Sequence, residues 1–281
     1  MEKVLITGCN GQLGRALNSL LEGTDTKIIN TDVDTLDICD ENQVLSLVKK
    51  EQPDTIINCA AHTAVDKCET EKENAHRINA IGPENLAKAA KETGAQIVQV
   101  STDYVFDGNT DTPYVETDVP CPQSVYGSTK LAGEKAVTAL TEKCYIVRTA
   151  WLYGDGNNFV KTMLRLAKER DTITVVNDQF GSPTSADELG RMILHIVDSE
   201  KYGIYHATCE GFTSWYEFAK SIFSLANINV NLVPVSTEEY TAAIAKRPAF
   251  SVLENHKLNS QGAYRMKNWQ DALEEYMGKL P

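Results

Sequence analysis

The chain has 281 residues, of which 42% are hydrophobic, and a formal net charge of −12. This size allows one large domain or two modest ones, and no run approaches the roughly 18 to 20 apolar residues of a membrane helix. The acidic balance argues against a general nucleic-acid-binding protein, which needs a basic face. We therefore expect neither a membrane nor a nucleic-acid partner.

The cysteines and the first residues predict a cytoplasmic protein. Seven cysteines are an odd number, and no two form a C-x-x-C pair, which favours reduced thiols over a disulfide framework or a zinc site. The chain enters a strand-like run at Val4, so we expect no signal peptide. The histidines show no H-E-x-x-H or other metal-ligand spacing, and no metal is predicted.

Strand-like and helix-like segments alternate along the first half of the chain. We predict strands at 4–7, 27–30, 54–58, 96–100 and 145–148, and helices at 12–21, 41–50 and 73–93. Such alternation is typical of parallel βαβ units in a doubly wound sheet. After Gly154 the pattern loosens, with helices near 159–170 and 214–226 and shorter strands such as 172–176.

These segments predict an α/β protein with a doubly wound, parallel Rossmann sheet and a smaller lobe. Residues 1–154 would form the dinucleotide-binding domain. Residues 155–281 would form a mainly C-terminal substrate-binding lobe, part of which could return to the Rossmann sheet.

A glycine pattern follows the first strand. Gly8, Gly11 and Gly14 stand between a strand and a helix, where free amides and the helix dipole favour a pyrophosphate. Glycines also permit the close approach of phosphates and of helix to strand. The spacing differs by one residue from the common G-x-G-x-x-G, and a plain glycine turn is the alternative. The strand–helix context favours the dinucleotide.

Residues after the next two strands extend the predicted cofactor site. Asp32 is placed to accept the adenosine ribose hydroxyls, with a solvated turn residue as the alternative. This favours NADH, because the carboxylates of Asp32 and Asp34 would repel the 2′-phosphate of NADPH and no arginine is near in the sequence to bind it. Asp37 and Ile38 could frame the adenine. Small residues over 58–63 would let the cofactor pass close, although they are also ordinary core residues.

Tyr126 and Lys130 are the residues that most directly indicate a catalytic reaction. They are four residues apart, so on a helix they share one face. A phenol with a pKa of about 10 is a poor acid at neutral pH, and we expect the neighbouring ammonium to lower that pKa. Thr102, at the end of the fourth strand, can hydrogen-bond a carbonyl oxygen. Y-x-x-x-K alone arises often by chance, but together with the glycine loop it favours reduction of a carbonyl group by a nicotinamide.

Eight short sequence motifs along the chain resemble motifs of one known protein superfamily. They are Gly8–Gly14, Ala60–Lys67, Ser101–Gly108, Tyr126–Glu134, Arg148–Gly154, Asn157–Phe159, Asp178–Thr184 and Arg247–Ser251. In these runs the chain resembles the extended short-chain dehydrogenase/reductases, and most closely the dTDP-4-dehydrorhamnose reductase family among them. The resemblance covers nearly the whole sequence.

The resemblance implies a reaction and a set of functional residues. The reaction would be reduction of the 4-keto group of dTDP-4-dehydro-L-rhamnose to dTDP-L-rhamnose, the last step of dTDP-rhamnose biosynthesis, with NADH or NADPH. Thr102, Tyr126 and Lys130 would be catalytic, and Thr102, Asp103 and Trp151 would contact the dTDP-sugar. The cofactor would meet Gly8, Asn10, Gly11, Gln12, Leu13, Asp32, Asp37, Ala60, Ala61, Thr63, Tyr126 and Lys130.

Family members that carry a divalent metal hold it with carboxylates at a dimer contact. The first-helix position that would supply one is Ala16 here, beside Arg15. We therefore predict no such metal, and a homodimer is left open.

Two alternatives remain at this point. One is another nucleotide-sugar reductase, epimerase or dehydratase of the same superfamily; an epimerase would keep its nicotinamide bound and consume none. The other is a non-catalytic dinucleotide-binding regulatory subunit, against which the intact Tyr126 and Lys130 speak. We expect Trp215 and Trp269 to be packing residues, and the basic residues Lys161, Arg165 and Arg247 to be solvated rather than bound to a diphosphate.

Overall fold

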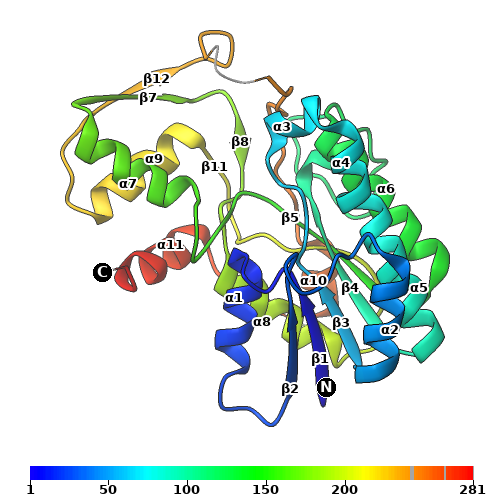
Figure 1. The fold of residues 1–281 in the computed structure, drawn as a ribbon. Coiled ribbons are helices and arrows are strands. Elements are labelled where there is room, and N and C mark those ends of the chain that lie inside the picture. Colours follow the sequence, from blue (N-terminus) through cyan, green and yellow to red (C-terminus); the bar gives the residue numbers. More distant parts are fainter. Residues whose placement is uncertain (241–243, 263, 281) are drawn as a thin grey trace.

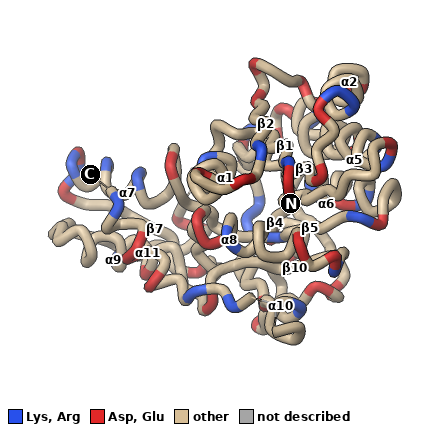
Figure 2. Tube along the Cα trace, turned by 90° about the horizontal axis from the view of Figure 1, so that it is seen from below, with Lys and Arg blue, Asp and Glu red and all other residues tan. Residues whose placement is uncertain are grey.

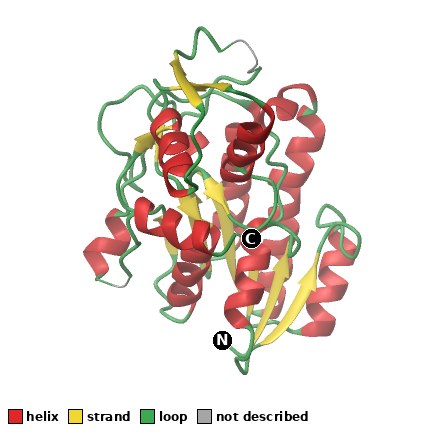
Figure 3. Ribbon diagram, turned by 90° about the vertical axis from the view of Figure 1, so that its left-hand side faces the viewer, coloured by secondary structure: helices red, strands yellow, loops and turns green. Residues whose placement is uncertain are grey.

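A six-stranded parallel sheet lies at the centre of the structure, a computed structural model that describes residues 1–240, 244–262 and 264–280 (Figures 1 and 3). Its strands, in spatial order, are β10 (Gly203–His206), β5 (Cys144–Thr149), β4 (Gln96–Thr102), β3 (Thr55–Asn58), β1 (Lys3–Thr7) and β2 (Lys27–Thr31). Every neighbouring pair is parallel, which confirms the predicted α/β class. Because chain order reverses between β1 and β3, a crevice is expected at their carboxyl ends.

Helices cover both faces of this sheet, because successive strand residues face opposite sides. Val4 and Ile6 pack under α1 (Gln12–Leu21) and α8 (Ala186–Val197). Leu5 packs on the other side, under α2 (Glu41–Glu51), α5 (Gly82–Thr93) and α6 (Val125–Leu140). Figure 1 shows the two helical layers on either side of the strands.

The segment predicted as one helix over 73–93 is interrupted. It consists of α4 (Lys72–His76), a π-helical turn at Arg77–Ile81 and α5, and it is preceded by the short helix α3 (Val65–Thr70). Pro83 lies in the first turn of α5. Proline has no backbone N–H and its ring crowds the preceding turn, which accounts for the wider π turn at this place.

The chain beyond residue 154 forms a third layer and also returns to the sheet. The separate layer contains α7 (Phe159–Glu169), α9 (Trp215–Leu225) and α11 (Trp269–Gly278), with β7 (Thr172–Val176) paired to β12 (Asn231–Val235). The short pairs β6–β9 (Leu152–Tyr153 with Thr184–Ser185) and β8–β11 (Phe180–Gly181 with Thr213–Ser214) lie between the layers. Helix α8, strand β10 and α10 (His256–Gln261) belong to the sheet half of the molecule.

Charges and thiols are spread over the chain. Figure 2 shows Lys and Arg scattered among Asp and Glu rather than gathered over one set of elements. All seven cysteines are free thiols. Within the described ranges, no helix has the length and apolar content needed to cross a membrane.

Candidate active site

The loop between β1 and α1 is built without room for side chains. Gly8 has φ +64°, and a Cβ there would lie 2.7 Å from the backbone nitrogen of Ala60. A Cβ on Gly14 would lie 2.6 Å from the Cα of Cys9. The N-cap of α1 is Gly11, which has no side chain to occupy the first-turn amides, so these amides can bind phosphate oxygens. The close packing gives a physical reason for the glycines at positions 8 and 14.

A pocket of about 730 Å³ opens on one side of this loop. The expected cofactor residues that line it are Gly8, Gly11, Asp32, Asp37, Ile38, Ala60, Ala61 and Thr63. The Oδ2 atom of Asp32 accepts a hydrogen bond from the backbone N–H of Asn10 at 2.9 Å. Its other oxygen, Oδ1, accepts the backbone N–H of Val33 at 2.8 Å, so Asp32 ties the end of β2 to the glycine loop.

Arg77 is a pocket residue that sequence reasoning missed. It lines the same pocket, and its Nη2 lies 3.4 Å from Oδ2 of Asp37. The sequence alone placed no arginine in this pocket; the structure brings Arg77 to Asp37, and among the described residues it shows no contact between Arg77 and Asp32. No local signal could have revealed Arg77, because it reaches the pocket only through the π turn before α5. A guanidinium here could accommodate an additional phosphate, so the carboxylates do not by themselves disfavour NADPH.

A second pocket, of about 550 Å³, continues the first along the carboxyl ends of the strands. The two pockets share Gly11, Cys59, Ala61 and Thr63, and we call their union the groove. Its second part is lined by further predicted site residues: Asn10, Gln12, Leu13, Thr102, Asp103, Tyr126, Lys130 and Trp151. The structure thus brings the residues predicted for cofactor, catalysis and substrate to one continuous surface.

Tyr126 lies in the first turn of α6, facing the end of β4. The N-cap hydroxyl of Ser124 accepts the N–H of Gly127 at 3.1 Å, which fixes where the helix begins. A Cβ on Gly127 would collide with the backbone of Tyr104, so the missing side chain lets α6 approach the loop after β4. The ring of Tyr104 meets the ring of Tyr126 edge-on, with centroids 5.4 Å apart.

The protonation of Tyr126 differs from the sequence-based expectation. Burial raises the pKa of its phenol, and a hydrogen bond with Thr102 only partly opposes this effect. The expectation that Lys130 lowers this pKa is therefore wrong here: the Nζ of Lys130 donates to the carbonyl oxygen of Val100 at 2.6 Å, and desolvation dominates. A phenol that retains its proton is in the right state to donate it to a carbonyl oxygen.

Asp103 presents a buried carboxylate to the groove. Its side chain is buried, and Oδ1 accepts a hydrogen bond from the Thr102 hydroxyl at 2.9 Å. Its Oδ2 has no partner among the described residues. Burial raises the pKa of Asp103 to about 6. Hydrogen bonds from Ser251 and Thr102 partly oppose this rise, and because Oδ2 is itself buried, a sugar hydroxyl could reach it only after a local rearrangement.

Two tryptophans form a stacked pair at the end of the groove. The rings of Trp151 and Trp215 are 3.5 Å apart between centroids and inclined by 9°, and both residues line the groove. Trp151 has φ +48°, an unfavourable conformation for a bulky residue. Trp215, expected to be a packing residue only, is therefore also a groove residue. Its position depends on α9, which is remote in sequence from Trp151.

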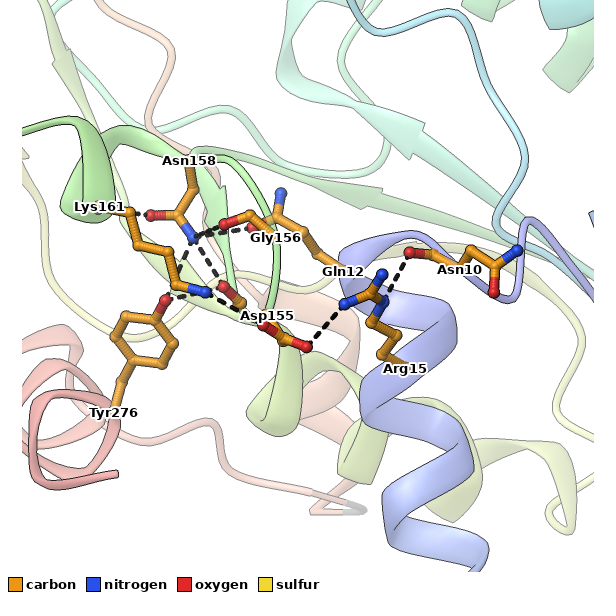
Figure 4. Close-up of polar contacts among 9 residues, drawn as sticks. Asn10, Gln12, Arg15, Asp155, Gly156, Asn158, Lys161 and Tyr276 are labelled. Atoms are coloured by element: carbon orange, nitrogen blue, oxygen red, sulfur yellow. Dashed lines mark hydrogen bonds and ion pairs between the residues drawn. The ribbon is translucent and has the colours of Figure 1, made fainter. Parts of the chain in front are cut away.

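Residues 155–157 line the groove beside the start of α1. Figure 4 shows Asp155 between two cations: Arg15 from α1, at 2.8 Å, and Lys161 from α7, at 3.0 Å. In the same view, Nδ2 of Asn158 donates to Oε1 of Gln12 at 3.2 Å. These contacts join the start of the C-terminal lobe to α1, the helix after the glycine loop.

The basic residues considered for a diphosphate are all ion-paired. Lys161 pairs with Asp155, and Arg165 pairs with Glu169 one turn later at 2.8 Å. The guanidinium of Arg247 holds both carboxylate oxygens of Asp66, at 2.7 and 3.2 Å. Hydrogen bonds from Arg247 lower the pKa of Asp66 to about 2. Arg247 therefore fastens the segment after 244 to α3.

No group of three His, Cys, Asp or Glu side chains in the described part of the chain is arranged to hold a metal ion. Ala16, which sequence reasoning assigned to the position of a metal-binding carboxylate, is buried in α1.

Known proteins resemble the chain over its whole length. The family model described as RmlD substrate binding domain matches residues 1–281. The dTDP-4-dehydrorhamnose reductase of Aggregatibacter actinomycetemcomitans is 42% identical over 97% of this chain and 97% of that protein. The solved dTDP-4-dehydrorhamnose reductase of Clostridium acetobutylicum is 52% identical, with a TM-score of 0.97 and 98% of each chain covered. The Bacillus anthracis enzyme of the same name, in complex with NADP, is 46% identical, with a TM-score of 0.97 and 99% of each chain covered.

Proposed function

The chain belongs to the RmlD substrate binding domain family, and on that premise we propose that it reduces the 4-keto group of dTDP-4-dehydro-L-rhamnose to give dTDP-L-rhamnose. NADH or NADPH is the hydride donor. The main observation behind this proposal is that Thr102, Tyr126 and Lys130 line one groove, and that this groove begins at the glycine loop. The names of the relatives support the choice of substrate.

The residues present fit a dinucleotide. Gly8 and Gly14 leave a cradle that a Cβ would fill, and the first-turn amides of α1 face a diphosphate. We assign the rest of the cofactor to Asn10, Gln12, Leu13, Asp32, Asp37, Ile38, Ala60, Ala61 and Thr63. When bound, the nicotinamide supplies a hydride to the carbonyl carbon.

Residues of the chain then protonate and hydrogen-bond the carbonyl oxygen. Tyr126 donates its phenolic proton to that oxygen as the carbon accepts the hydride, so that the ketone becomes an alcohol. When the substrate binds, the Thr102 hydroxyl turns from Oδ1 of Asp103, to which it donates in this structure, and donates its proton to the same carbonyl oxygen, which stabilises the charge that develops there. We assign Lys130, whose Nζ is held at the carbonyl oxygen of Val100, to the nicotinamide ribose.

In this proposal the two lobes bind mainly different ligands. Residues 1–154 hold the dinucleotide and contribute Asp103 and Trp151 to the sugar nucleotide, and residues 155–281 form the remainder of the sugar-nucleotide site. Asp103 and Trp151, the latter supported by Trp215, contact the sugar nucleotide. We place the reaction in the cytoplasm, and we assign no nucleic-acid or membrane partner.

A direct assay tests the proposal. The purified protein is mixed with dTDP-4-dehydrorhamnose, and the oxidation of NADH and of NADPH is followed by absorbance in separate reactions. We expect stoichiometric cofactor oxidation with formation of dTDP-L-rhamnose. Tightly retained nicotinamide with no net oxidation would indicate an epimerase, and dinucleotide binding without any conversion would indicate a regulatory subunit.

The pH profile of the reduction should fall on the alkaline side near pH 8. Burial lowers the pKa of Lys130 to about 8, so its positive charge is present below that pH and is lost as the pH rises through it. We expect kcat/KM, measured with saturating cofactor, to fall roughly tenfold per pH unit above this point. A profile that stays flat to about pH 10, the ordinary pKa of lysine, would contradict a requirement for the charged form.

A further inference from the structure

A buried ion pair lies directly behind the proposed catalytic residues and takes no part in the steps described above. Glu134 on α6 and Arg148 on β5 have side chains that are only 4% and 2% exposed. The guanidinium binds the carboxylate through two nitrogens, Nη2 to Oε2 at 2.7 Å and Nε to Oε1 at 3.0 Å. The Nη1 atom of Arg148 is also buried and has no partner in the described chain.

Stability alone is a weak reason for such a pair. Removing two charges from water costs several kcal/mol per ion, and replacing a buried pair by apolar residues is often neutral or stabilising. The unpartnered Nη1 adds a further penalty. The placement of Glu134 relative to the active site therefore calls for another explanation.

The carboxylate of Glu134 joins three elements of the site. Its Oε1 accepts a hydrogen bond from the hydroxyl of Ser101, the residue before Thr102. Ser101 and Arg148 face each other in the register of β4 and β5. Glu134 thus fastens α6, which carries Tyr126, to the strand end that carries Thr102.

Glu134 also places a negative charge beside Lys130. The two residues are four apart on α6 and lie on its buried face. The charge of Glu134 opposes the effect of burial on Lys130 and raises its pKa. Without this charge, the buried ammonium would be harder to keep protonated.

The other titratable groups around this cluster do not change charge between about pH 7 and pH 10, the range that separates ordinary histidine from ordinary lysine. Burial raises the pKa of Cys59, which faces Lys130 from the end of β3, to about 12. Burial, aided by Arg148, lowers the pKa of His206 on β10 to about 3. Burial raises the pKa of Asp103 only to about 6 and that of Tyr126 well above its ordinary value. Of these groups, Lys130 is the one that titrates in this range.

We propose that Glu134 is a positioning residue for the reduction: its carboxylate fixes α6 against the ends of β4 and β5 and keeps Lys130 charged. This inference rests on the proposed function, because it assigns a role in the same active site. Glu134 itself touches neither substrate nor cofactor.

The test compares Glu134→Gln with a double variant, Glu134→Gln/Arg148→Met. The single variant leaves Arg148 buried without its counter-charge and should be less stable; the double variant removes both charges and should regain stability. We expect the alkaline limb of both variants to move down by roughly one pH unit, so that the loss of Lys130 charge lowers kcat/KM about twofold at pH 7 and roughly tenfold at about pH 9. Glu142→Gln, which neutralises an exposed carboxylate just after the helix, is the matched control and should leave both quantities unchanged.

Two results would overturn the inference. One is an unchanged alkaline limb in Glu134→Gln. The other is a double variant that regains both the turnover and the pH profile of the wild type, which would make the pair a purely structural element.

A measurement that needs no turnover separates this inference from the proposed function. The ionisation of Lys130 is followed by NMR in protein with ¹³C-labelled lysine side chains, and its signal is assigned by its loss in Lys130→Met. A lower pKa of Lys130 in Glu134→Gln would support the role of Glu134 even if the wild type failed to reduce the sugar. An unchanged pKa would refute it.

Discussion

Tyr126→Phe is expected to lower kcat for the reduction roughly 10²- to 10⁴-fold, the usual contribution of a general acid. The substitution removes one oxygen and leaves the ring against Tyr104, which it meets edge-on. Cofactor affinity and thermal stability should therefore change little. The measurement is kcat with saturating cofactor and sugar nucleotide, together with a titration of NADPH binding.

Tyr153→Phe is a suitable control for this prediction. It removes another buried phenol hydroxyl, one that has no hydrogen-bond partner among the described residues, and it should leave kcat close to that of the wild type. If Tyr126→Phe retained turnover within about tenfold of the wild type, the proton would have to come from another group. Asp103, whose pKa is raised to about 6 by burial, would then be the next candidate.

The sequence predicted well those parts of the site whose function depends on local backbone geometry, such as a tight turn or the end of a strand. The glycine pattern predicted a tight turn, and Gly8 does have a positive φ and backbone neighbours that exclude a side chain. Thr102 could be placed at a strand end from periodicity alone, and strand ends in a parallel sheet meet at one edge. Motifs that are separate in the sequence therefore converge on the groove once the sheet order is known.

The residues that were missed depend on packing between distant segments. Arg77 reaches the cofactor pocket through a π turn, and Trp215 reaches the groove by stacking on Trp151. Neither position has a local pattern that differs from an ordinary helix. The ion pair between Arg15 and Asp155 likewise requires the loop after β6 to lie over α1.

The protonation of Tyr126 was mispredicted for a related reason. Four-residue spacing places Tyr126 and Lys130 on one helical face, but it does not give the depth of burial or the direction of the ammonium. The structure places the ammonium on the carbonyl oxygen of Val100. Desolvation, which is a tertiary property, then decides the direction of the pKa shift.

Gly14→Ala is expected to weaken NADPH binding at least about 100-fold, which corresponds to about 2.7 kcal/mol. A Cβ at this position would overlap the carbonyl oxygen of Gly8 and lie 2.6 Å from the Cα of Cys9 and 2.8 Å from its carbonyl carbon. All of these are backbone atoms, so the glycine loop itself would have to move. Such a shift would take the first-turn amides of α1 out of reach of the phosphates, and hydrogen bonds to charged groups contribute roughly 1.5 to 3 kcal/mol each.

The matched control for this prediction is Gly278→Ala, at the end of α11. A Cβ there would meet nothing within 4 Å, and alanine is a better helix former than glycine, so NADPH affinity should be unchanged and stability equal or slightly higher. Thermal unfolding of both variants distinguishes a displaced loop from a lost fold: Gly14→Ala should still unfold cooperatively, because α1 remains anchored by Leu13 and Leu17 in the core under the sheet. A dissociation constant for Gly14→Ala within about threefold of the wild type would mean that the loop tolerates the methyl group or that the phosphates bind elsewhere. The same result would remove the main structural reason for placing the diphosphate at the N-terminus of α1, since that placement depends on backbone amides that only a tightly packed loop can present.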